Sequence, residues 1–321
     1  MLRKLTLIGL LIFLTSPARA EPIVTIRGHV LNGTFDRRPL PGRFVQVVRM
    51  SREGVVIASV RTNANGEFTA RIPESDGTYV VVARHGEVEY ASEPFRLKPG
   101  PPARINVVVY EPTTLRPPLV FPFRIVLIDR FGAGVISVRE VVAIANPWPR
   151  TYIGQRSPQE GFTLTLALPQ GAEAVEVLRG LGSASLEKGR LIDRAPLQPG
   201  EHEIAYAYQV RYWGTKARLR WALDEDTGSM DVFAPDQGER LASNVLEAKP
   251  SGMVKGQRFL RLARDELRSG EVVEVIVTGL PGNYSPVVPF LAIVLAVVLS
   301  SSTLMAIRKA KKDQISSMAS D

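Results

Sequence analysis

The chain has 321 residues, of which 40 are lysine or arginine and 32 are aspartate or glutamate, giving a net charge of +8. Such a basic balance is typical of nucleic-acid-binding proteins. Here, however, Arg3, Lys4 and Arg19 contribute three of the charges and residues 308–321 a net two, which leaves +3 for the rest. Most of the basic excess therefore lies in predicted targeting segments, and nucleic acid is not expected as a partner.

The chain contains no cysteine. In an exported protein this excludes disulfides, acylation of a lipoprotein cysteine and thiol redox catalysis. Stability must then come from packed apolar cores. The roughly 260 residues outside the predicted targeting segments are enough for two such cores.

The first twenty residues have the three parts of a secretory signal peptide. Arg3 and Lys4 form the positive start, and residues 5–14 form an apolar stretch too short to cross a bilayer. Small residues then lead to Ala20, so cleavage after Ala20 is predicted and residues 1–20 are assigned as the signal peptide. A retained N-terminal anchor is the alternative. The short apolar run and the good cleavage site disfavour it.

The C-terminal region predicts one membrane anchor. Residues 286–307 carry no charge, which is long enough to cross about 30 Å of hydrocarbon as a helix. Basic residues follow at once, which marks residues 308–321 as a cytoplasmic tail. A buried core helix is the alternative, and the uninterrupted length disfavours it. We therefore expect a single-pass protein of the bacterial inner membrane, with its N-terminal domains in the periplasm.

Residues 23–110 are short runs in which apolar and polar side chains alternate. The apolar members of three such runs are Val24, Ile26 and Val30; Phe68, Ala70 and Ile72; and Ile105, Val107 and Val109. Turn sequences rich in Asn and Gly separate the runs, for example at residues 63–66 and 85–86. A period of two is typical of strands with one buried face, so this region is predicted to be a β-sandwich of roughly seven strands.

The order of motifs in this region resembles a known family. Gly28 is followed by R-P-L-P-G at residues 38–42, T-N-A-N-G-E-F at residues 62–68 and G-T-Y-V-V-V at residues 77–82. Over residues 22–112 this order resembles the carboxypeptidase regulatory-like domain, a transthyretin-like or prealbumin-like sandwich; Asn63 stands where that family usually has aspartate. The resemblance implies a fold and no chemistry. The family name comes from a domain appended to carboxypeptidases, so peptidase activity is not implied here.

A proline-rich linker and a second domain are predicted next. Residues 113–120 contain Pro117 and Pro118 and have no apolar period, so they are predicted to form a short, stiff linker between a first domain at residues 21–112 and a second at residues 121–283. The second domain is predicted as a sandwich of eight or nine strands. Its candidate strands are residues 123–128, 135–145, 162–168, 174–178, 203–212, 216–222, 230–233, 258–262 and 271–278.

The fold class is thus all-β: two tandem β-sandwich domains, the first prealbumin-like or Ig-like, with one C-terminal transmembrane helix. The motif E-x-x-x-x-x-N-P at residues 140–147 and the later P-L-x-P-G-E run resemble a module of bacterial membrane-anchored proteins. No chemistry is attached to that second resemblance.

The sequence offers no catalytic or metal-binding constellation. The three histidines, His29, His85 and His202, have no metal-ligand spacing, and each is expected to be a solvated residue of a strand or turn. The motifs of serine hydrolases, P-loops and dinucleotide-binding folds are absent. We therefore expect a protein that is not an enzyme, with no catalytic residues, no metal and no cofactor.

One pair of predicted strands has the composition of an interface. Residues 204–213 and 216–222 are predicted to form a hairpin with a turn at Gly214 and Thr215. Tyr206, Tyr208 and Tyr212 share one face of the first strand. The candidate partner-binding surface is Arg211, Trp213, Lys216, Arg218 and Arg220. The alternative is an ordinary amphipathic hairpin with its aromatic side chains in the core and its cations in water.

From these features we expect a membrane-anchored envelope protein that binds another envelope protein as an accessory or assembly subunit. Tandem sandwiches above an anchor present binding surfaces at a fixed height over a bilayer, and no residues form a recognisable active site. A carbohydrate- or cell-wall-binding module is one alternative, with an envelope polysaccharide as the ligand. A hydrolase that uses a carboxylate site undetectable in the sequence is the other.

Overall fold

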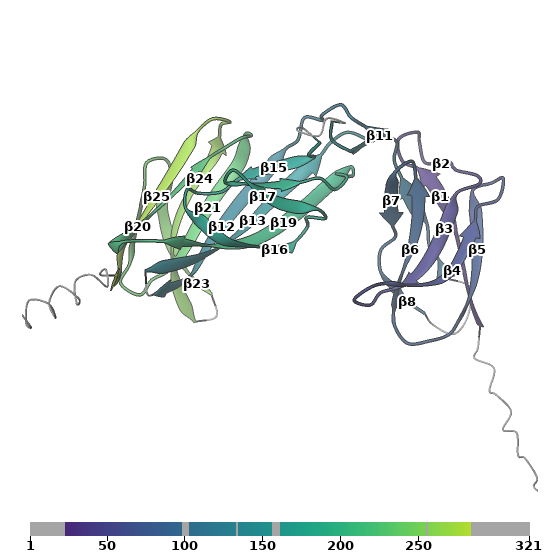
Figure 1. Ribbon diagram of the computed structural model, residues 1–321, viewed down its shortest axis with the longest axis horizontal. Coiled ribbons are helices and arrows are strands. Elements are labelled where there is room, and N and C mark those ends of the chain that lie inside the picture. Colours follow the sequence, from purple (N-terminus) through teal and green to yellow (C-terminus); the bar gives the residue numbers. More distant parts are fainter. Residues whose placement is uncertain (1–22, 98–102, 133, 156–160, 255, 284–321) are drawn as a thin grey trace, which may run out of the picture. The chain divides into compact units, whose positions relative to one another are not determined.

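The computed structural model describes residues 23–97, 103–132, 134–155, 161–254 and 256–283. These residues form strands and no helix, and they divide into two compact units (Figure 1). The first unit runs to Pro112 and also includes Pro149–Thr151; the second contains Thr113–Trp148 and the chain from Tyr152 onward. The predicted signal peptide at residues 1–20 and the predicted span at residues 286–307 lie outside the described residues.

No helix in the part of the chain that the structure describes is long and apolar enough to cross a membrane.

The first unit is a β-sandwich of two five-stranded sheets. In one sheet β1 is central and pairs with all the others, and in the second β6 pairs with three neighbours. The first sheet consists of β1 (Ile23–Asn32), β2 (Arg38–Pro39), β5 (Glu67–Pro73), β9 (Ala103–Arg104) and β10 (Val107–Val109). The second consists of β3 (Phe44–Arg49), β4 (Val55–Arg61), β6 (Thr78–His85), β7 (Val88–Ala91) and β8 (Phe95–Arg96).

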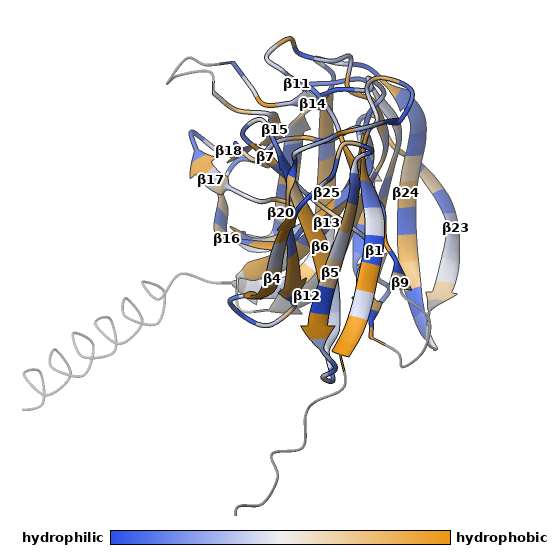
Figure 2. Cartoon of the chain, turned by 90° about the vertical axis from the view of Figure 1, so that its right-hand side faces the viewer, coloured by the Kyte–Doolittle hydropathy of each residue, from blue (hydrophilic) through white to orange (hydrophobic). Residues whose placement is uncertain are grey.

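Strict alternation builds the core of the first unit, as predicted. Even-numbered side chains of β1 and β5, such as Ile26 and Phe68, are buried, whereas their odd-numbered neighbours face outward. Figure 2 shows this alternation as a change of hydropathy along the strands. The unit has ten strands rather than the roughly seven expected, because two-residue strands such as β2, β8 and β9 have no periodicity that a sequence could reveal.

Gly28 is required where β1 passes the segment that links β9 to β10. β1 pairs in parallel with both strands in one continuous register, with Arg27 opposite Arg104 and Val30 opposite Val107. A Cβ at Gly28 would lie 1.6 Å from the carbonyl oxygen of Ile105. Only glycine lets the two backbones approach this closely.

A seven-stranded sheet forms the frame of the second unit. Its order is β16 (Ala172–Arg179), β19 (Gly200–Arg211), β13 (Val135–Asn146), β12 (Phe121–Gly132), β21 (Thr227–Pro235), β24 (Gln257–Leu267) and β23 (Glu247–Val254). All its pairings are antiparallel except that of β12 with β21, which is parallel. Most of these strands bury alternate side chains in one continuous core.

Smaller sheets complete the second unit. One has the order β20 (Gly214–Ala222), β25 (Val272–Asn283) and β22 (Arg240–Ser243), and its inner side chains belong to the same core as those of the large sheet. Another has the order β15 (Leu164–Ala167), β18 (Arg190–Asp193) and β17 (Ala184–Glu187). A separate two-stranded sheet pairs β11 (Pro112–Thr113) with β14 (Thr151–Tyr152); Pro112 and Thr151 belong to the first unit, and Thr113 and Tyr152 to the second.

The prediction of eight or nine strands in the second domain is therefore too low. The nine candidate runs correspond to β12, β13, β15, β16, β19, β20, β21, β24 and β25. The strands that were missed are β14, β17, β18, β22 and β23. β17 and β18 join through Lys188 and Gly189, both at positive φ, a turn that a Lys-Gly pair does not strongly signal.

Candidate functional site

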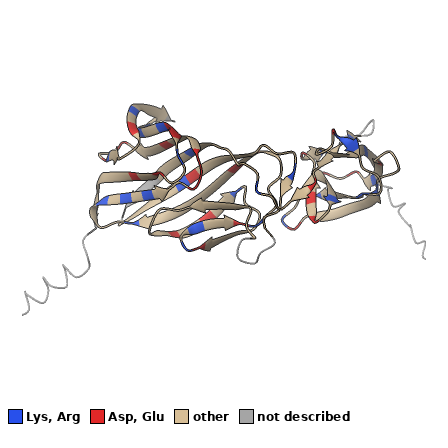
Figure 3. Cartoon of the chain, turned by 90° about the horizontal axis from the view of Figure 1, so that it is seen from above, with Lys and Arg blue, Asp and Glu red and all other residues tan. Residues whose placement is uncertain are grey.

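β20 carries a row of exposed cations. Lys216, Arg218 and Arg220 point outward, while the alternate residues Ala217, Leu219 and Trp221 are buried in the core. The period of two produces this division, because successive side chains of a strand leave on opposite faces. In Figure 3, which colours lysine and arginine positions blue, a row of blue bands runs along one strand of the second unit.

Trp213 lies at the start of this row and is 67% exposed. It follows Tyr212, whose side chain is buried and whose hydroxyl donates to the carbonyl of Pro281 at 2.9 Å. Gly214 then takes a φ of +65°, which turns the chain from β19 into β20. Because Tyr212 is held in the core and Gly214 turns the chain, the indole of Trp213 lies in solvent. Tryptophan side chains are seldom so exposed.

The predicted hairpin between β19 and β20 is wrong. β19 pairs with β13 and β16 in the large sheet, and β20 pairs with β25 in the small one. Only an isolated bridge between Trp213 and Lys216 joins the two segments. The chain crosses from one sheet to the other at this point, because β19 already has a partner on each edge. Arg211 therefore lies on a different sheet from Lys216, Arg218 and Arg220, and Trp213 lies in the crossing segment between them.

The charges of the candidate surface differ in how far they are neutralised. Arg211 Nε lies 2.6 Å from Glu173 Oε1, and Arg218 Nε lies 3.5 Å from Glu274 Oε1. Ion pairs this exposed are weak and leave the cations accessible. Across the small sheet Lys216 is opposite Thr278, and Thr278 is opposite Arg240 of β22. Arg240 thus joins the same outer face, a residue that sequence spacing could not connect with β20.

The tyrosines of β19 serve the core instead. Tyr206 and Tyr208 are buried, and their hydroxyls donate to Glu140 Oε2 at 2.8 Å and Oε1 at 2.6 Å. Trp221 Nε1 donates to the same Oε1 at 2.8 Å, and Arg124 Nε lies 3.7 Å from Oε2. Burial and then the charge of Glu140 raise the pKa of both tyrosines well above the usual value, so both hydroxyls stay protonated and donate.

One prediction about the histidines is wrong. His85 was expected to be solvated in a turn, but it is the last residue of β6 and is buried, because the alternation of that strand continues through it. Its Nε2 lies 2.9 Å from Glu111 Oε1, and Asn32 Nδ2 donates to the same oxygen at 2.7 Å. His202 Nε2 lies 2.7 Å from the carbonyl of Gln198.

Among the residues that the structure describes, no three histidine, aspartate or glutamate side chains gather as they would around a metal ion.

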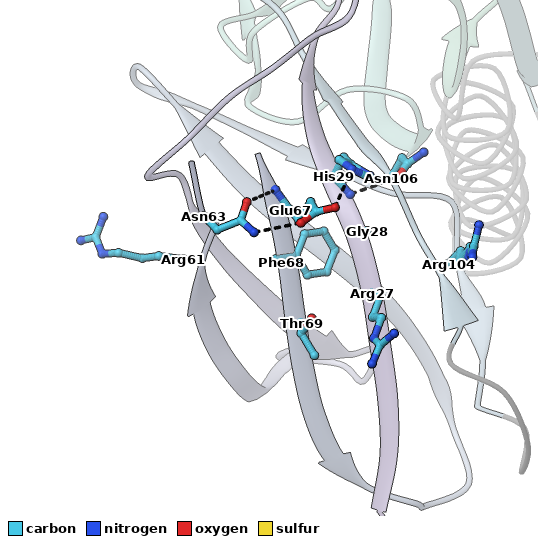
Figure 4. Close-up of a pocket in the computed structure, with 10 residues that line it drawn as sticks. All are labelled: Arg27, Gly28, His29, Arg61, Asn63, Glu67, Phe68, Thr69, Arg104 and Asn106. Carbon is cyan, nitrogen blue, oxygen red and sulfur yellow. Dashed lines mark hydrogen bonds and ion pairs between the residues drawn. The ribbon is translucent and has the colours of Figure 1, made fainter. Parts of the chain in front are cut away.

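A hollow of about 750 Å³ lies on the outer face of the first unit (Figure 4). Sequence analysis missed it, because its lining comes from segments far apart in the chain. Arg27 and His29 belong to β1, Glu67 and Thr69 to β5, and Arg104 to β9. His29 Nε2 lies 3.6 Å from Glu67 Oε1, and the His29 backbone N–H donates to Asn106 Oδ1 at 3.0 Å.

The comparisons with known proteins bear on the fold. No curated protein sequence matches the chain. Among solved structures, an M1 zinc metallopeptidase from Deinococcus radiodurans is similar with a TM-score of 0.32 and 10% identity, over 50% of this chain and 42% of that one. The chain thus spans less than half the length of that metallopeptidase.

Two further solved structures are similar over larger shares of their own chains. A DUF3823 family protein from Parabacteroides merdae has a TM-score of 0.23 and 15% identity, over 58% of this chain and 80% of that one. The major pilin subunit of Bacillus cereus has a TM-score of 0.23 and 10% identity, over 79% of this chain and 87% of that one.

The family match concerns the first unit. The family model described as the carboxypeptidase regulatory-like domain matches residues 25–110. This range begins inside β1 and ends one residue after β10, so it takes in the strands of both five-stranded sheets. The first unit of this chain is therefore a carboxypeptidase regulatory-like β-sandwich domain, as its motifs predicted.

Proposed function

We propose that this chain is a non-enzymatic, membrane-anchored protein of the bacterial envelope whose second unit binds another envelope protein. The observation that carries the proposal is the 67% exposure of Trp213 beside the outward cations of β20. Tryptophan and arginine are the residues that most often dominate the energy of protein interfaces. An indole held in water has the most apolar surface to lose when a partner covers it.

The position of this surface suggests where the partner lies. Gly214, next to Trp213, pairs with Asn283 at the end of β25. The predicted membrane span begins at residue 286, three positions later in the chain. A partner that covers Trp213 is therefore expected close to the bilayer, as another subunit of a membrane complex would be.

Alanine substitutions test the proposal. Trp213→Ala, Arg218→Ala and Arg220→Ala remove exposed side chains, so the fold is expected to survive each of them. The full-length tagged protein is purified from cells in mild detergent, and co-purifying proteins are identified by mass spectrometry. We expect the partner to be lost from each variant, with the largest loss for Trp213→Ala.

A matched control comes from the large sheet. Met253 is 65% exposed and Arg258 is exposed, and they face each other in the pairing of β23 with β24. Met253→Ala and Arg258→Ala remove comparable apolar and cationic groups, and they should leave partner recovery unchanged. Equal recovery from the Trp213→Ala variant and the wild type would contradict the proposal.

A polysaccharide of the envelope is the second candidate ligand, because an exposed indole can also stack on a sugar ring. The full-length protein in detergent is incubated with purified cell-wall polysaccharides, and the fluorescence of Trp213 is followed by comparison with Trp213→Phe. A saturable change lost in Trp213→Phe, together with no co-purifying protein, moves the function to glycan binding.

A further inference from the structure

The hollow on the first unit holds two arginines directly opposite each other. β1 and β9 run in parallel with Arg27 in register with Arg104, so both side chains leave the same face of the sheet. Both residues are exposed, and neither forms an ion pair with any residue that the structure describes. Like charges in directly opposite positions of a sheet repel each other and destabilise the pairing. Anionic groups bound to the two arginines would reduce that repulsion.

The other charged groups of the hollow already have partners. Glu67 accepts a hydrogen bond from Asn63 Nδ2 at 2.9 Å and lies 3.6 Å from His29. Arg61 donates to the carbonyl of Gly42 at 3.1 Å, and its guanidinium lies 5.8 Å from the centre of the Phe44 ring. Figure 4 shows Arg61 extending away from the His29–Glu67 pair. Arg61 keeps its charge but is engaged by these contacts, so the cations of the hollow that have no partner among the described residues are Arg27 and Arg104.

The rest of the lining supports one class of ligand. Thr69, opposite Arg27 on β5, supplies a hydroxyl, and Asn106 keeps its amide NH2 as a donor because its oxygen accepts from His29. Phe68, the aromatic residue of the lining, is only 2% exposed and cannot stack on a sugar ring. The volume of about 750 Å³ falls in the range of about 300–1,000 Å³ of ligand sites.

From this unneutralised positive charge we propose that the hollow binds an acidic segment of another protein, with Arg27 and Arg104 binding its carboxylates. Guanidinium groups bind carboxylates with two parallel hydrogen bonds, which suits aspartate and glutamate side chains. This site is separate from the surface around Trp213, and the inference does not depend on the proposed function.

Binding of a labelled hexaglutamate peptide to the full chain in non-ionic detergent tests the proposal, with fluorescence anisotropy as the readout. We expect saturable binding that weakens as salt is added, and a loss of about tenfold in affinity for Arg27→Gln and for Arg104→Gln. Arg71→Gln is the matched control, because Arg71 is exposed on the same face of β5 but outside the lining of the hollow. Trp213→Ala should also bind the peptide normally.

Three results would overturn this assignment: hexaglutamine binding as tightly as hexaglutamate, full affinity in Arg27→Gln, or binding of polygalacturonate without any binding of hexaglutamate. The last result would assign the hollow to an anionic glycan. Thermal unfolding gives a second check. Removing either arginine relieves repulsion, so neither variant should unfold at a lower temperature than the wild type without peptide.

Discussion

Glu140 is a completely buried acid that three aromatic side chains and one arginine surround. Arg124, its neighbour across β12 and β13, is also buried, and its Nη1 has no hydrogen-bond partner among the described residues. Removing one member of a buried charge pair costs more than the pair contributes, because the other charge stays in the core without compensation. Glu140 is therefore a residue on which the second unit depends.

Glu140→Leu should lower the free energy of unfolding by about 3–5 kcal/mol, because it removes the buried acid that pairs with Arg124 and leaves three donors without an acceptor. Glu140→Gln keeps an acceptor and should cost less, about 1–3 kcal/mol. Denaturant titration followed by tryptophan fluorescence measures both, since Trp221 donates to Glu140. A loss below about 1 kcal/mol for Glu140→Leu would show that the network is not needed.

Glu111 makes the first unit sensitive to acid. Partial burial raises its pKa, but hydrogen bonds from His85 and Asn32 outweigh this effect and hold the pKa below its ordinary value of 4.5. The unfolded chain then binds this proton more tightly than the folded one. The ionised Glu111 carboxylate therefore stabilises the fold at pH values above 4.5. This stabilisation is lost as the pH falls through the lower pKa that Glu111 has in the folded state.

Glu111→Gln should consequently make the stability of the protein less dependent on pH between about 6 and 3, because a neutral amide cannot be protonated there. Denaturant titrations across this range measure the effect. Glu87→Gln, a change at an exposed turn residue of the same unit, serves as the control and should follow the wild type. An identical pH dependence for Glu111→Gln and wild type would refute the role of Glu111.

At the scale of the elements, β1 holds the first sheet together. It pairs with β2 and β5 along one edge and with β9 and β10 along the other. Gly28 permits the close passage of Ile105, and no side chain fits there. The parallel pairing also brings Arg27 and Arg104 together, so the proposed anion site depends on the same passage.

Gly28→Ala should lower the free energy of unfolding by more than about 2 kcal/mol, because the new methyl group would overlap the carbonyl of Ile105. Gly252→Ala is the matched control, since a Cβ there meets no atom within 4 Å. Denaturant titration compares the two variants. Equal free energies of unfolding for the two variants would mean that β1 and the β9–β10 segment can move apart without destabilising the fold.

The sequence predicted strands well and strand partners poorly. Alternation in residues 24–30 and 216–222 identified the buried faces of β1 and β20, because burial of a strand depends on its own side chains. Pairing depends on distant segments instead. β20 therefore pairs with β25 rather than β19, and β23 was missed because Pro250 and Gly252 break its pattern.

The residues of the two candidate sites also divide into those that the sequence predicted and those that it did not. The exposure of Trp213, Lys216, Arg218 and Arg220 follows from local alternation, so these residues could be named from the sequence. The arginine pair of the hollow could not be predicted from the sequence. Arg27 and Arg104 are far apart in the chain and become neighbours only through the parallel pairing of β1 with β9. Arg240 joins the β20 surface in the same way, through β25.

At the scale of the whole molecule, the two units offer different surfaces. The first carries an arginine pair in a polar hollow, and the second carries an exposed tryptophan beside a row of cations. Each unit has a core of its own strands, so each can present its surface on a rigid sheet. Tandem domains of this kind suit the proposed role of a tethered envelope protein that makes more than one contact.

Photo-crosslinking in living cells tests the central claim most directly. A photoreactive amino acid replaces Trp213 in one full-length variant and Met253, which is 65% exposed on another sheet, in a second. After illumination the protein is purified under denaturing conditions, and its adducts are identified by mass spectrometry. We predict one envelope protein attached at position 213 and not at position 253. No adduct at position 213, or the same adducts at both positions, would contradict the account.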